Sequence, residues 1–442
     1  MRSLVFILPF FFSLGYLLWD RRDLAFLNVY LPCLIFLPDY YAFRVPHLPP
    51  ESAASWALLP LGLSLLFYPI PRLQLRRLDL WVTLYALSFL ASELLREPNP
   101  KDGAVLFGQY ASSVFLAYIV GRRVIEPNLR DATVQRIVLL FVCLAPFIFY
   151  EYVDRNPWLI MAPHFHLDVT ASIQVRNGSP RVQACFGHAI LAGILFFIVL
   201  ILNYFLADLY KRDKSRLGPI ICWLERYHVA ALLILVFLWL TQSRGPMLSA
   251  VVGYVILQIP RFRHRKVAAF VVLLFLAIAG SAAYSYFDKY TSATDEANMS
   301  EEQQSAMYRR ELMKNYEPVV EKGGWLGLGL FGIPEVGGQK SIDNAYLIIE
   351  LAQGKLGFYL FLLVIAEALV STAFRAFSFH SRESRFFAFI LLGAMIGLFL
   401  SLTAVFLGPS VAPVCFLLLG WSQSIQDNAS KEPKFYFKRL FV

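Results

Sequence analysis

Long apolar stretches, separated by short polar connections, run along almost the whole chain. Many are about 17 to 20 residues long, which is the length that an α-helix needs to cross the hydrocarbon core of a bilayer. The stretches lie near residues 3–19, 24–42, 53–69, 79–94, 104–120, 132–152, 184–207, 228–242, 246–260, 267–286, 343–373, 386–403 and 408–424. The pattern predicts an all-α polytopic membrane protein with about 12 to 14 transmembrane helices, in a single membrane domain over residues 1–442.

Basic residues are concentrated in alternate connections, and these predict the orientation of the chain. The clusters are Arg72, Arg76 and Arg77; Arg122, Arg123 and Arg130; Lys211, Arg212, Lys214 and Arg216; Arg261, Arg263, Arg265 and Lys266; and Arg375, Arg382 and Arg385. By the positive-inside rule we expect them, and the basic C-terminal segment Lys431 to Arg439, in the cytoplasm. Segment 24–42 contains two prolines and leaves the N-terminal orientation open.

With this orientation, two long segments face the outside, residues 153–183 and residues 287–342. The second contains Ser300-Glu301-Glu302-Gln303, which has the form of a helix capping box. Apolar residues follow at i+4 spacing, at Tyr308, Leu312, Tyr316 and Val320. We therefore expect an amphipathic helix of about five turns across the outer end of the bundle, as a lid over a cleft. Its polar side would carry Arg309, Arg310 and Lys314, and Gly323 and Gly324 would end it.

Composition excludes an ordinary soluble enzyme. Only 16% of the residues are charged and 58% are hydrophobic, whereas a soluble domain has about 25% charged residues. The net charge of +9 reflects loop orientation and lipid headgroups in this setting, and no nucleic-acid function is expected. The five cysteines lie far apart without the spacing of a zinc site and are expected to be inert. No cofactor is expected.

Arg244 is the first candidate for chemistry. It lies in Thr241-Gln242-Ser243-Arg244-Gly245-Pro246, between two half-length apolar runs, where the charge alternation predicts the outer surface. An arginine within the membrane is functional by default, whereas one at the interface can anchor the helix by extending its charge into water. The neighbouring glycine and proline favour a bend with exposed backbone, which suits a substrate pocket.

Arg181 and Asp343 are the other two candidates for catalysis. Arg181 precedes a long apolar helix on the outer side, and both a guanidinium and a helix N-terminus favour an anion. Arg176, close by in the chain, is an equal candidate, and an interfacial anchor remains the alternative for Arg181. Asp343 opens the span after the second loop, where a carboxylate is either a helix N-cap or a general base.

Three other patterns are set aside as evidence of function. Gly327-Leu328-Gly329-Leu330-Phe331-Gly332 matches GxGxxG but has no preceding strand, so it does not predict a dinucleotide site. His164, His166 and Asp168 are expected to be plain surface rather than a metal site. Glu350 and Glu367 lie within an apolar run, where an interhelical hydrogen bond is as good an explanation as a proton relay.

Taken together, these motifs resemble the O-antigen ligase and Wzy-type polymerase superfamily over about residues 130 to 375. The resemblance is carried by Ser243-Arg244-Gly245, by Arg181 followed by Phe186-Gly187-His188, by Arg309 ahead of Trp325-Leu326-Gly327-Leu328-Gly329, and by Asp343-Asn344-Ala345-Tyr346-Leu347 ahead of Gly354 and Gly357. It implies an inverting, metal-independent glycosyltransferase of the bacterial inner membrane, similar to the GT-C type. Its active site would face the periplasm and use an undecaprenyl-diphosphate-linked glycan as donor.

The resemblance also implies roles for individual residues and partners. Asp343, Arg244 and Arg181 would be catalytic, and Arg176, Arg309, Arg310, His188, Asn344 and Tyr346 would bind substrate. Ligases of this superfamily usually have a histidine where this chain has Asp343, and an acidic residue where it has Ala352, so a polymerase is the first expectation and a ligase the second. The acceptor would be a glycan or a second lipid-linked unit, among membrane lipids and with a chain-length regulator as a further partner. A lipid or glycan transporter is the alternative of another class.

Overall fold

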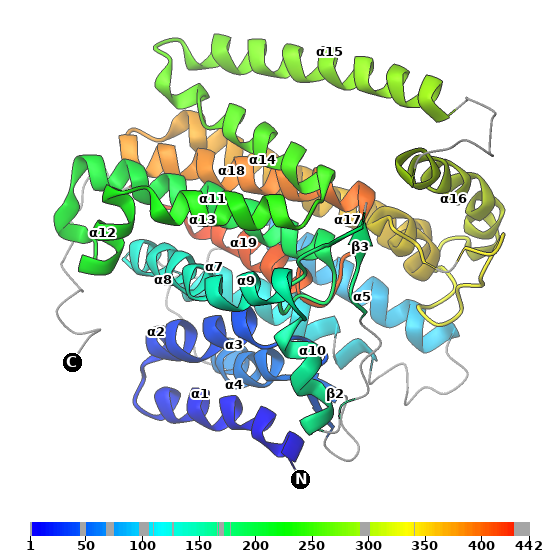
Figure 1. Cartoon of the computed structure of the whole chain (residues 1–442), viewed down its shortest axis with the longest axis horizontal. Coiled ribbons are helices and arrows are strands. Elements are labelled where there is room, and N and C mark those ends of the chain that lie inside the picture. Colours follow the sequence, from blue (N-terminus) through cyan, green and yellow to red (C-terminus); the bar gives the residue numbers. More distant parts are fainter. Residues whose placement is uncertain are drawn as a thin grey trace.

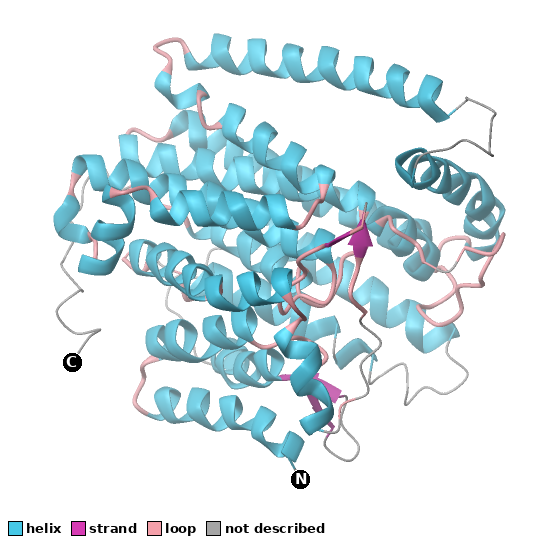
Figure 2. Cartoon of the chain, viewed as in Figure 1, coloured by secondary structure: helices cyan, strands magenta, loops and turns pink. Residues whose placement is uncertain are grey.

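The computed structural model describes residues 2–44, 50–67, 75–96, 106–108, 110–125, 128–165, 167, 172–176, 178–291, 301–339 and 341–427. Helices make up nearly all of its regular structure (Figure 1). Within the described ranges, the strands form two small antiparallel hairpins, β1 (Ala42–Arg44) with β2 (Pro50–Ser52) and β3 (Val175–Arg176) with β4 (Ser179–Pro180). Figure 2 shows these strands as short arrows beside the helices. The predicted all-α polytopic architecture is confirmed.

The helices follow the predicted apolar stretches, with breaks that the pattern does not show. In the first third of the chain they are η1 (Arg2–Ile7), α1 (Leu8–Leu18), α2 (Arg22–Leu24), η2 (Ala25–Tyr30), α3 (Leu31–Phe36), α4 (Ala53–Phe67), α5 (Arg77–Arg96), η3 (Ser112–Leu116), α7 (Ala117–Arg123), α8 (Arg130–Cys143) and α9 (Ala145–Val153). They continue with α10 (Pro157–Met161), η4 (Ala162–Phe165), α11 (Ala189–Arg212), η5 (Lys214–Arg216), α12 (Pro219–Arg226), α13 (Val229–Leu240), α14 (Arg244–Ile256) and η6 (Ile259–Arg261). The last are α15 (Arg265–Thr291), α16 (Glu301–Gly323), α17 (Ala345–Ser378), α18 (Arg382–Ser401), η8 (Leu402–Ala404) and α19 (Ala412–Ser424).

Within the described part of the chain, six helices are long and apolar enough to cross a membrane, or seven when α12 and α13, bent by 70°, count as one span. This is fewer than the 12 to 14 spans expected. Several apolar stretches form shorter or broken helices instead, such as Leu4–Leu18 and Ala53–Leu66, and segment 24–42 is divided among α2, the π-helical η2 and α3. Hydrophobicity sets the number of apolar stretches, but it does not set whether each stays helical over a full bilayer thickness.

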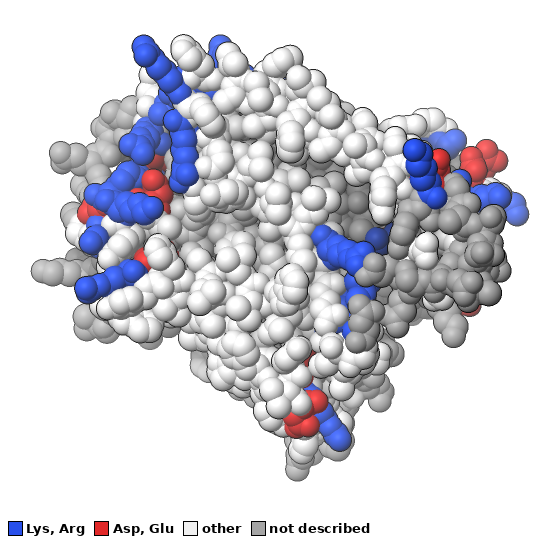
Figure 3. Space-filling view, turned by 45° about the horizontal axis from the view of Figure 1, so that its top comes forward, with Lys and Arg blue, Asp and Glu red and all other residues white. Residues whose placement is uncertain are grey.

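Charged residues on the surface gather toward the two ends of the molecule. On the face drawn in Figure 3, most of the Lys, Arg, Asp and Glu lie toward the two ends of the long axis, and a broad band between them is almost uncharged. The long helices run roughly along this axis (Figure 1). An apolar girdle between two polar ends is the surface expected of a bundle that spans a bilayer.

The centre of the bundle is α11, which packs against α13, α14 and α18. It is apolar all round, and 89% of its most hydrophobic window is buried, as expected for a helix surrounded by protein. By contrast, none of the corresponding window of α15 is buried, and Figure 1 shows α15 lying along the upper edge of the molecule, apart from the central helices. The buried helices hold the loops at their ends, where the candidate residues lie.

Helix α17 contains a break that fixes the second long loop. Gly354 has φ 68° and ψ −170°, a conformation open to glycine and unfavourable for other residues. The carbonyl oxygens of Leu351 and Ala352, which lose helical partners at the break, accept hydrogen bonds from the N–H groups of Leu328 (2.8 Å) and Gly329 (3.0 Å). The glycine-rich segment is thus a loop docked on a broken helix.

The predicted helix of the second loop is confirmed as α16. Its apolar side packs on the start of α17, where Leu312 and Tyr316 form a small buried cluster with Leu347 and Leu351. The Tyr308 hydroxyl donates a hydrogen bond to the carbonyl of Ser341, just before Asp343. Packing and this hydrogen bond together fix α16 against the segment that leads into α17.

Candidate functional site

The turn between α13 and α14 is where Arg181 is held. Its Nε donates a hydrogen bond to the carbonyl oxygen of Thr241 (3.0 Å), and its terminal nitrogen Nη2 donates to the Ser243 hydroxyl (2.9 Å). The backbone N–H of Val182 also bonds to the carbonyl of Leu240 at the end of α13 (3.1 Å). Residues about 60 positions apart in the sequence are thereby joined at one end of the bundle.

Arg176, on strand β3, reaches the same turn. Its terminal nitrogen Nη1 donates to the carbonyl of Gln242 (2.9 Å). Gln242 has φ 49°, a left-handed conformation that is strained for a residue other than glycine. Such strain is retained where the surroundings enforce it, and it is common at binding sites. The turn thus presents carbonyl and hydroxyl oxygens, all uncharged, to two guanidinium groups.

Arg244 is the first residue of α14 and directly follows this turn. Its side chain is exposed, whereas the preceding Ser243 is buried and accepts a hydrogen bond from Arg181. The start of a helix carries a partial positive charge, because its first N–H groups have no helical partners. Arg244 therefore adds a cation at a point that already favours anions, beside the arginines of the first loop.

His188 lies at the N-terminus of α11, where it caps the helix. Its Nδ1 accepts a hydrogen bond from the N–H of Ile190 (3.1 Å), which leaves Nε2 to carry the proton of the neutral ring. Burial lowers the pKa of His188, the carboxylate of Asp343 acts in the opposite direction, and Arg181 lowers it further. The residue is therefore a neutral hydrogen-bond donor at Nε2, close enough to both Asp343 and Arg181 to feel their charges.

Arg309, on α16, completes the group. Burial lowers its pKa, the carboxylate of Asp343 raises it, and the positive charge of Arg176 lowers it. Burial likewise lowers the pKa of Arg181 to about 10, with further contributions from Arg176 and Arg309. Each of the three arginines thus lies within the field of another. We refer to Arg176, Arg181 and Arg309, with His188 and Asp343, as the arginine cluster.

Asp343 lies just before α17, and it is Asn344 that caps this helix. The Asn344 side-chain oxygen accepts hydrogen bonds from the N–H groups of Tyr346 (3.0 Å) and Leu347 (3.3 Å). Asp343 instead accepts a hydrogen bond from the Ser341 hydroxyl (3.2 Å). The sequence left open whether Asp343 is a cap, and the structure assigns the cap to its neighbour. The carboxylate is therefore available on the side of Arg309 and His188.

Two candidate residues are placed differently. The Tyr346 hydroxyl donates to the carbonyl of Phe399 on α18 (2.9 Å), so its polar atom is used in helix packing. Arg310 forms an ion pair with Asp288 of α15 (3.5 Å), and both side chains are at least half exposed. Adjacent residues on a helix point in different directions, so Arg309 and Arg310 cannot both face the arginine cluster.

Glu151, at the end of α9, is a positioning residue that the sequence pattern did not single out. Its carboxylate accepts hydrogen bonds from the side-chain nitrogen of Asn156 (2.8 Å) and from the N–H groups of Gln183 (3.0 Å) and Ala184 (2.8 Å). Ala184 has φ 50°, so the carboxylate holds a strained backbone three residues after Arg181. The signal in the sequence is a glutamate at the end of an apolar stretch. A carboxylate buried there needs several hydrogen-bond donors, so it indicates a position that holds neighbouring backbone.

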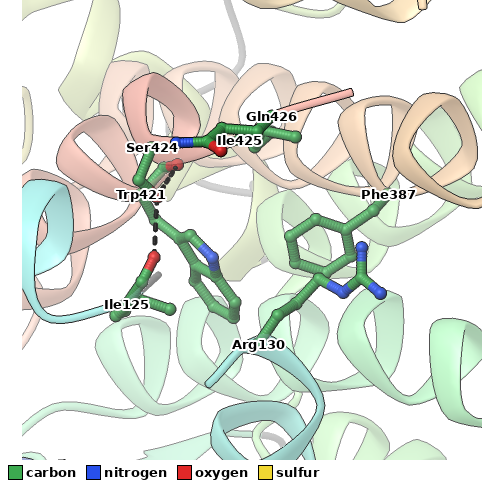
Figure 4. Close-up of a pocket in the computed structure, with 7 residues that line it drawn as sticks. All are labelled: Ile125, Arg130, Phe387, Trp421, Ser424, Ile425 and Gln426. Carbon is green, nitrogen blue, oxygen red and sulfur yellow. Dashed lines mark hydrogen bonds between the residues drawn. The ribbon is translucent and has the colours of Figure 1, made fainter. Parts of the chain in front are cut away.

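Other polar features lie outside the cluster. Among the described residues, no group of three or more His, Cys, Asp and Glu could hold a metal ion, and His166 and Asp168 fall outside those residues. A small pocket is drawn in Figure 4, where the side chains of Arg130 and Trp421 lie on either side of Phe387. None of its lining residues is a predicted site residue, and Arg130 begins α8 at the opposite end of the bundle.

The arrangement suits a large anion. The three arginines lie within one another's electric fields, Asp343 acts on Arg309 and His188, and burial strengthens the repulsion between the like charges. Guanidinium groups bind phosphates through two parallel hydrogen bonds between opposite charges. Neutral carbonyl oxygens accept hydrogen bonds from a guanidinium but do not neutralise its charge. An anion between the arginines would relieve this repulsion. Asp343, at the edge of the same group, is placed to accept a proton.

Comparison with protein families gives a match for part of the chain. Residues 229–362 match the family model Wzy_C, described as O-Antigen ligase, and no curated protein matches the chain. The matched segment runs from α13 into α17, so it contains Arg244, Arg309 and Asp343, whereas Arg176, Arg181 and His188 precede it. The match confirms the resemblance to the O-antigen ligase and Wzy-type superfamily over residues 229–362.

Proposed function

We propose that the protein polymerises undecaprenyl-diphosphate-linked oligosaccharide repeat units, as a metal-independent, inverting glycosyltransferase with its site on the periplasmic side of the inner membrane. The observation that carries the proposal is the convergence of Arg181 and Arg176 on the Thr241 to Ser243 turn, beside Arg309 and Asp343. Such a group combines binding of a diphosphate with a nearby base. The family match supports the class of reaction proposed.

In this proposal the arginines bind the diphosphate of the donor. Arg176 and Arg181 already lie on hydrogen-bond acceptors of the turn, so their positions are fixed before substrate arrives. Arg309 approaches from α16, and Arg244 stands at the start of α14. Preorganised donors aimed at a developing charge stabilise a transition state without reorganisation, which is often the largest contribution to catalysis. The leaving diphosphate is where that charge develops.

The transfer step itself needs one base. The oxygen of an acceptor sugar hydroxyl attacks the anomeric carbon of the donor from the face opposite the diphosphate. The bond between that carbon and the diphosphate oxygen breaks, and the diphosphate leaves with the electron pair. The hydroxyl proton passes to the carboxylate of Asp343, and attack from the opposite face inverts the configuration. His188, neutral and with its proton on Nε2, donates a hydrogen bond to a phosphate oxygen.

The charges of the connections support a placement of this chemistry outside the cytoplasm. The segments 153–183 and 287–342, which carry most of the arginine cluster, are the long connections opposite the basic clusters. Arg176 and Arg181 belong to the first segment and Arg309 to the second. We therefore propose both segments as periplasmic loops, with a chain-length regulator as a further partner at that side.

A ligase is the second candidate, because the matching family model is described as O-Antigen ligase. The same cluster would then transfer the lipid-linked glycan to lipid A core or another acceptor. Only the acceptor differs between the two reactions, and the arginine cluster binds the donor. The acceptor site, and not the donor-binding arginines, therefore distinguishes a polymerase from a ligase.

The test is to incubate the purified full-length protein with lipid-linked repeat units, with and without a separate acceptor, and to resolve the products by size. A ladder of longer lipid-linked chains supports the polymerase. Product only when the separate acceptor is present would instead indicate the ligase. Unchanged substrate under both conditions, with movement of substrate across reconstituted vesicles, would indicate a transporter. A chelator is expected to leave transfer unchanged.

Arg244 gives a focused variant of this assay. Because its side chain is exposed, Arg244→Ala is expected to keep expression and melting temperature while transfer falls by about a hundredfold, the effect of losing one charged donor in such a site. Arg226→Ala, an exposed arginine on α12, is the matched control and should transfer normally. Unchanged polymer length in Arg244→Ala would remove this residue from the proposed site.

A further inference from the structure

A second set of arginines lies at the end of the bundle away from the arginine cluster. There the carboxylate of Asp79, in the first turn of α5, accepts hydrogen bonds from several donors. It accepts hydrogen bonds from the Tyr118 hydroxyl (2.5 Å), from Nε of Arg122 (2.6 Å) and from the backbone N–H of Arg76 (2.8 Å). The carboxylate therefore forms a complete pair with Arg122, whose side chain is only 11% exposed. Its other hydrogen bonds come from the Tyr118 hydroxyl and from the backbone N–H of Arg76 at the start of α5.

Two neighbouring arginines converge instead on one neutral atom. Nη2 of Arg375, near the end of α17, donates to the side-chain oxygen of Gln423 (2.8 Å), and Nη1 of Arg76 approaches the same oxygen (3.4 Å). Arg375 also donates to the carbonyl of Ser422. Among the residues that the structure describes, neither guanidinium forms an ion pair with a carboxylate. We call Arg76, Arg375 and Gln423 the Gln423 fork.

The fork is held rigidly. Gln423 is 1% exposed, and its side-chain nitrogen donates to the hydroxyls of Ser371 (2.9 Å) and Ser422 (3.1 Å), which fixes its oxygen toward the arginines. The helices on either side pack closely, since a Cβ on Gly420 of α19 would lie 2.1 Å from the carbonyl of Tyr118 on α7. Two half-buried cations therefore share one amide oxygen in a fixed position.

The electrostatics of this arrangement are unfavourable without an anion. Burial lowers the pKa of Arg76, the positive charge of Arg122 lowers it further, and Asp79 acts in the opposite direction. An amide oxygen carries only a partial charge, so it compensates less than a carboxylate would. Here a fixed acceptor holds the two guanidinium groups in place. A phosphate can accept a pair of hydrogen bonds from each guanidinium group, so the arrangement suits its oxygens.

We propose that the Gln423 fork binds a phosphate-bearing anion, either the headgroup of an anionic phospholipid or free phosphate. Basic pockets between membrane helices are established sites for anionic headgroups. The fork lies where α5 begins and where α17 and α19 end, at a polar end of the bundle where headgroups meet protein. This proposal is independent of the transferase reaction, because the fork and the arginine cluster lie at opposite ends of α17.

The experiment measures lipid binding and thermal stability of the purified full-length protein in a neutral detergent. Phosphatidylglycerol, phosphatidylethanolamine and inorganic phosphate are added separately, and retained lipid is counted by native mass spectrometry. Phosphatidylglycerol is expected to raise the melting temperature and to stay bound. In the double variant Arg76→Gln with Arg375→Gln, the concentration needed for half of this effect should rise at least about tenfold, since charged hydrogen bonds are lost.

Two further variants keep the test decisive. Gln423→Glu supplies an internal carboxylate, so it should raise the melting temperature in lipid-free detergent and remove the response to phosphatidylglycerol. Arg263→Gln, at an exposed arginine between α14 and α15, is the control and should respond like the unaltered protein. An undiminished response in Gln423→Glu or in the double variant, or an equal response to phosphatidylethanolamine, overturns the proposal. An equal response to inorganic phosphate supports the anion site and assigns free phosphate as its ligand.

Discussion

Arginines at the two ends of α11 are held in opposite ways. At its start, in the arginine cluster, Arg181 and Arg176 donate to the carbonyl and hydroxyl oxygens of a turn. At its other end, Arg216 donates to the carboxylate of Asp131 (2.9 Å) and to that of Glu383 (2.7 Å). Arg130 also pairs with Glu383 and lies over the rings of Phe205 and Phe387, 5.0 and 5.2 Å from their centroids. We call Arg130, Asp131, Arg216 and Glu383 the paired network.

The pKa shifts of the two sets have opposite signs. Burial and neighbouring arginines lower the pKa of Arg181 to about 10. Burial would also lower the pKa of Arg216, but hydrogen bonds to Glu383 and the charges of Asp131 and Glu383 raise it above its usual value. In the paired network the positive charge is neutralised by the protein. In the arginine cluster it remains for a ligand, so an arginine suggests an anion site when the acceptors that hold it are neutral.

The largest expected effect is that of Asp343→Asn at the arginine cluster. Without a base, transfer should fall by about 10² to 10⁴, while donor binding is kept because the arginines are unchanged. The measurements are the rate of chain extension and the binding of a labelled lipid-linked donor. Asp427→Asn is the control, because Asp427 accepts hydrogen bonds from the N–H groups of His380 and Ser381 at the other end. An active Asp343→Asn variant would show that this carboxylate is not the base.

Arg181→Ala comes next. We expect transfer to fall by about 10² to 10³, because a preorganised donor to the leaving group is lost. Arg181→Lys should recover only part of the activity, since a lysine cannot bond to Thr241 and Ser243 as a fork. Donor affinity and melting temperature are measured for both variants. A large loss of stability with normal donor affinity would show that Arg181 stabilises the fold, as the paired network does, and does not bind the donor. The contrast between the two ends of α11 would then be wrong.

Glu383→Gln tests the paired network in the same way. Removing this carboxylate leaves Arg130 and Arg216 to share Asp131, which should lower the free energy of unfolding by about 3 kcal/mol. Transfer per folded molecule should stay normal, because the network lies at the far end of α11. Thermal unfolding and the transfer assay are compared in the same detergent. Lost transfer at full stability would show that the two ends are coupled.

The smallest effect concerns the pH dependence of stability at His188. The folded-state pKa of His188 is lowered by burial, so the unfolded chain binds a proton more readily than the folded one. Its contribution to stability is therefore present above the unfolded value of about 6.5 and is lost as pH falls through the lower folded value. Melting temperatures between about pH 5 and about pH 8 should show this loss. His188→Asn, which keeps a capping residue, should make that region flatter, and identical curves would contradict a neutral His188.

Much of the architecture followed from the sequence pattern. The apolar stretches correctly predicted an all-α membrane protein, and the capping box with its i+4 spacing correctly predicted α16. Fewer helices than predicted are long and apolar enough to span a membrane in the described part of the chain, because stretches such as 24–42 are divided among several short helices. A helix can be interrupted only where its freed backbone groups find other hydrogen bonds, and hydropathy does not report these.

The candidate site shows the same division. Arg181, Arg244 and Asp343 were selected from local motifs, and the structure gathers Arg181 and Asp343 with Arg309 and places Arg244 at the adjoining turn. Local motifs could not show that Tyr346 is bonded to Phe399, since that contact joins positions far apart in the chain. Glu151 was missed for the same reason, because its role depends on the backbone of a segment about 30 residues away.

The sequence by itself determined the membrane class, the order of the motif-bearing segments and the helical form of the second loop, because hydrophobic length and local spacing are properties of neighbouring residues. Only the tertiary structure decided which arginines are neutralised. Arg130 and Glu383 are 253 positions apart, and Arg375 and Gln423 are 48 apart. Coulomb energy depends on distance in space and on burial, so the charge that is left for a ligand is fixed only when the helices pack.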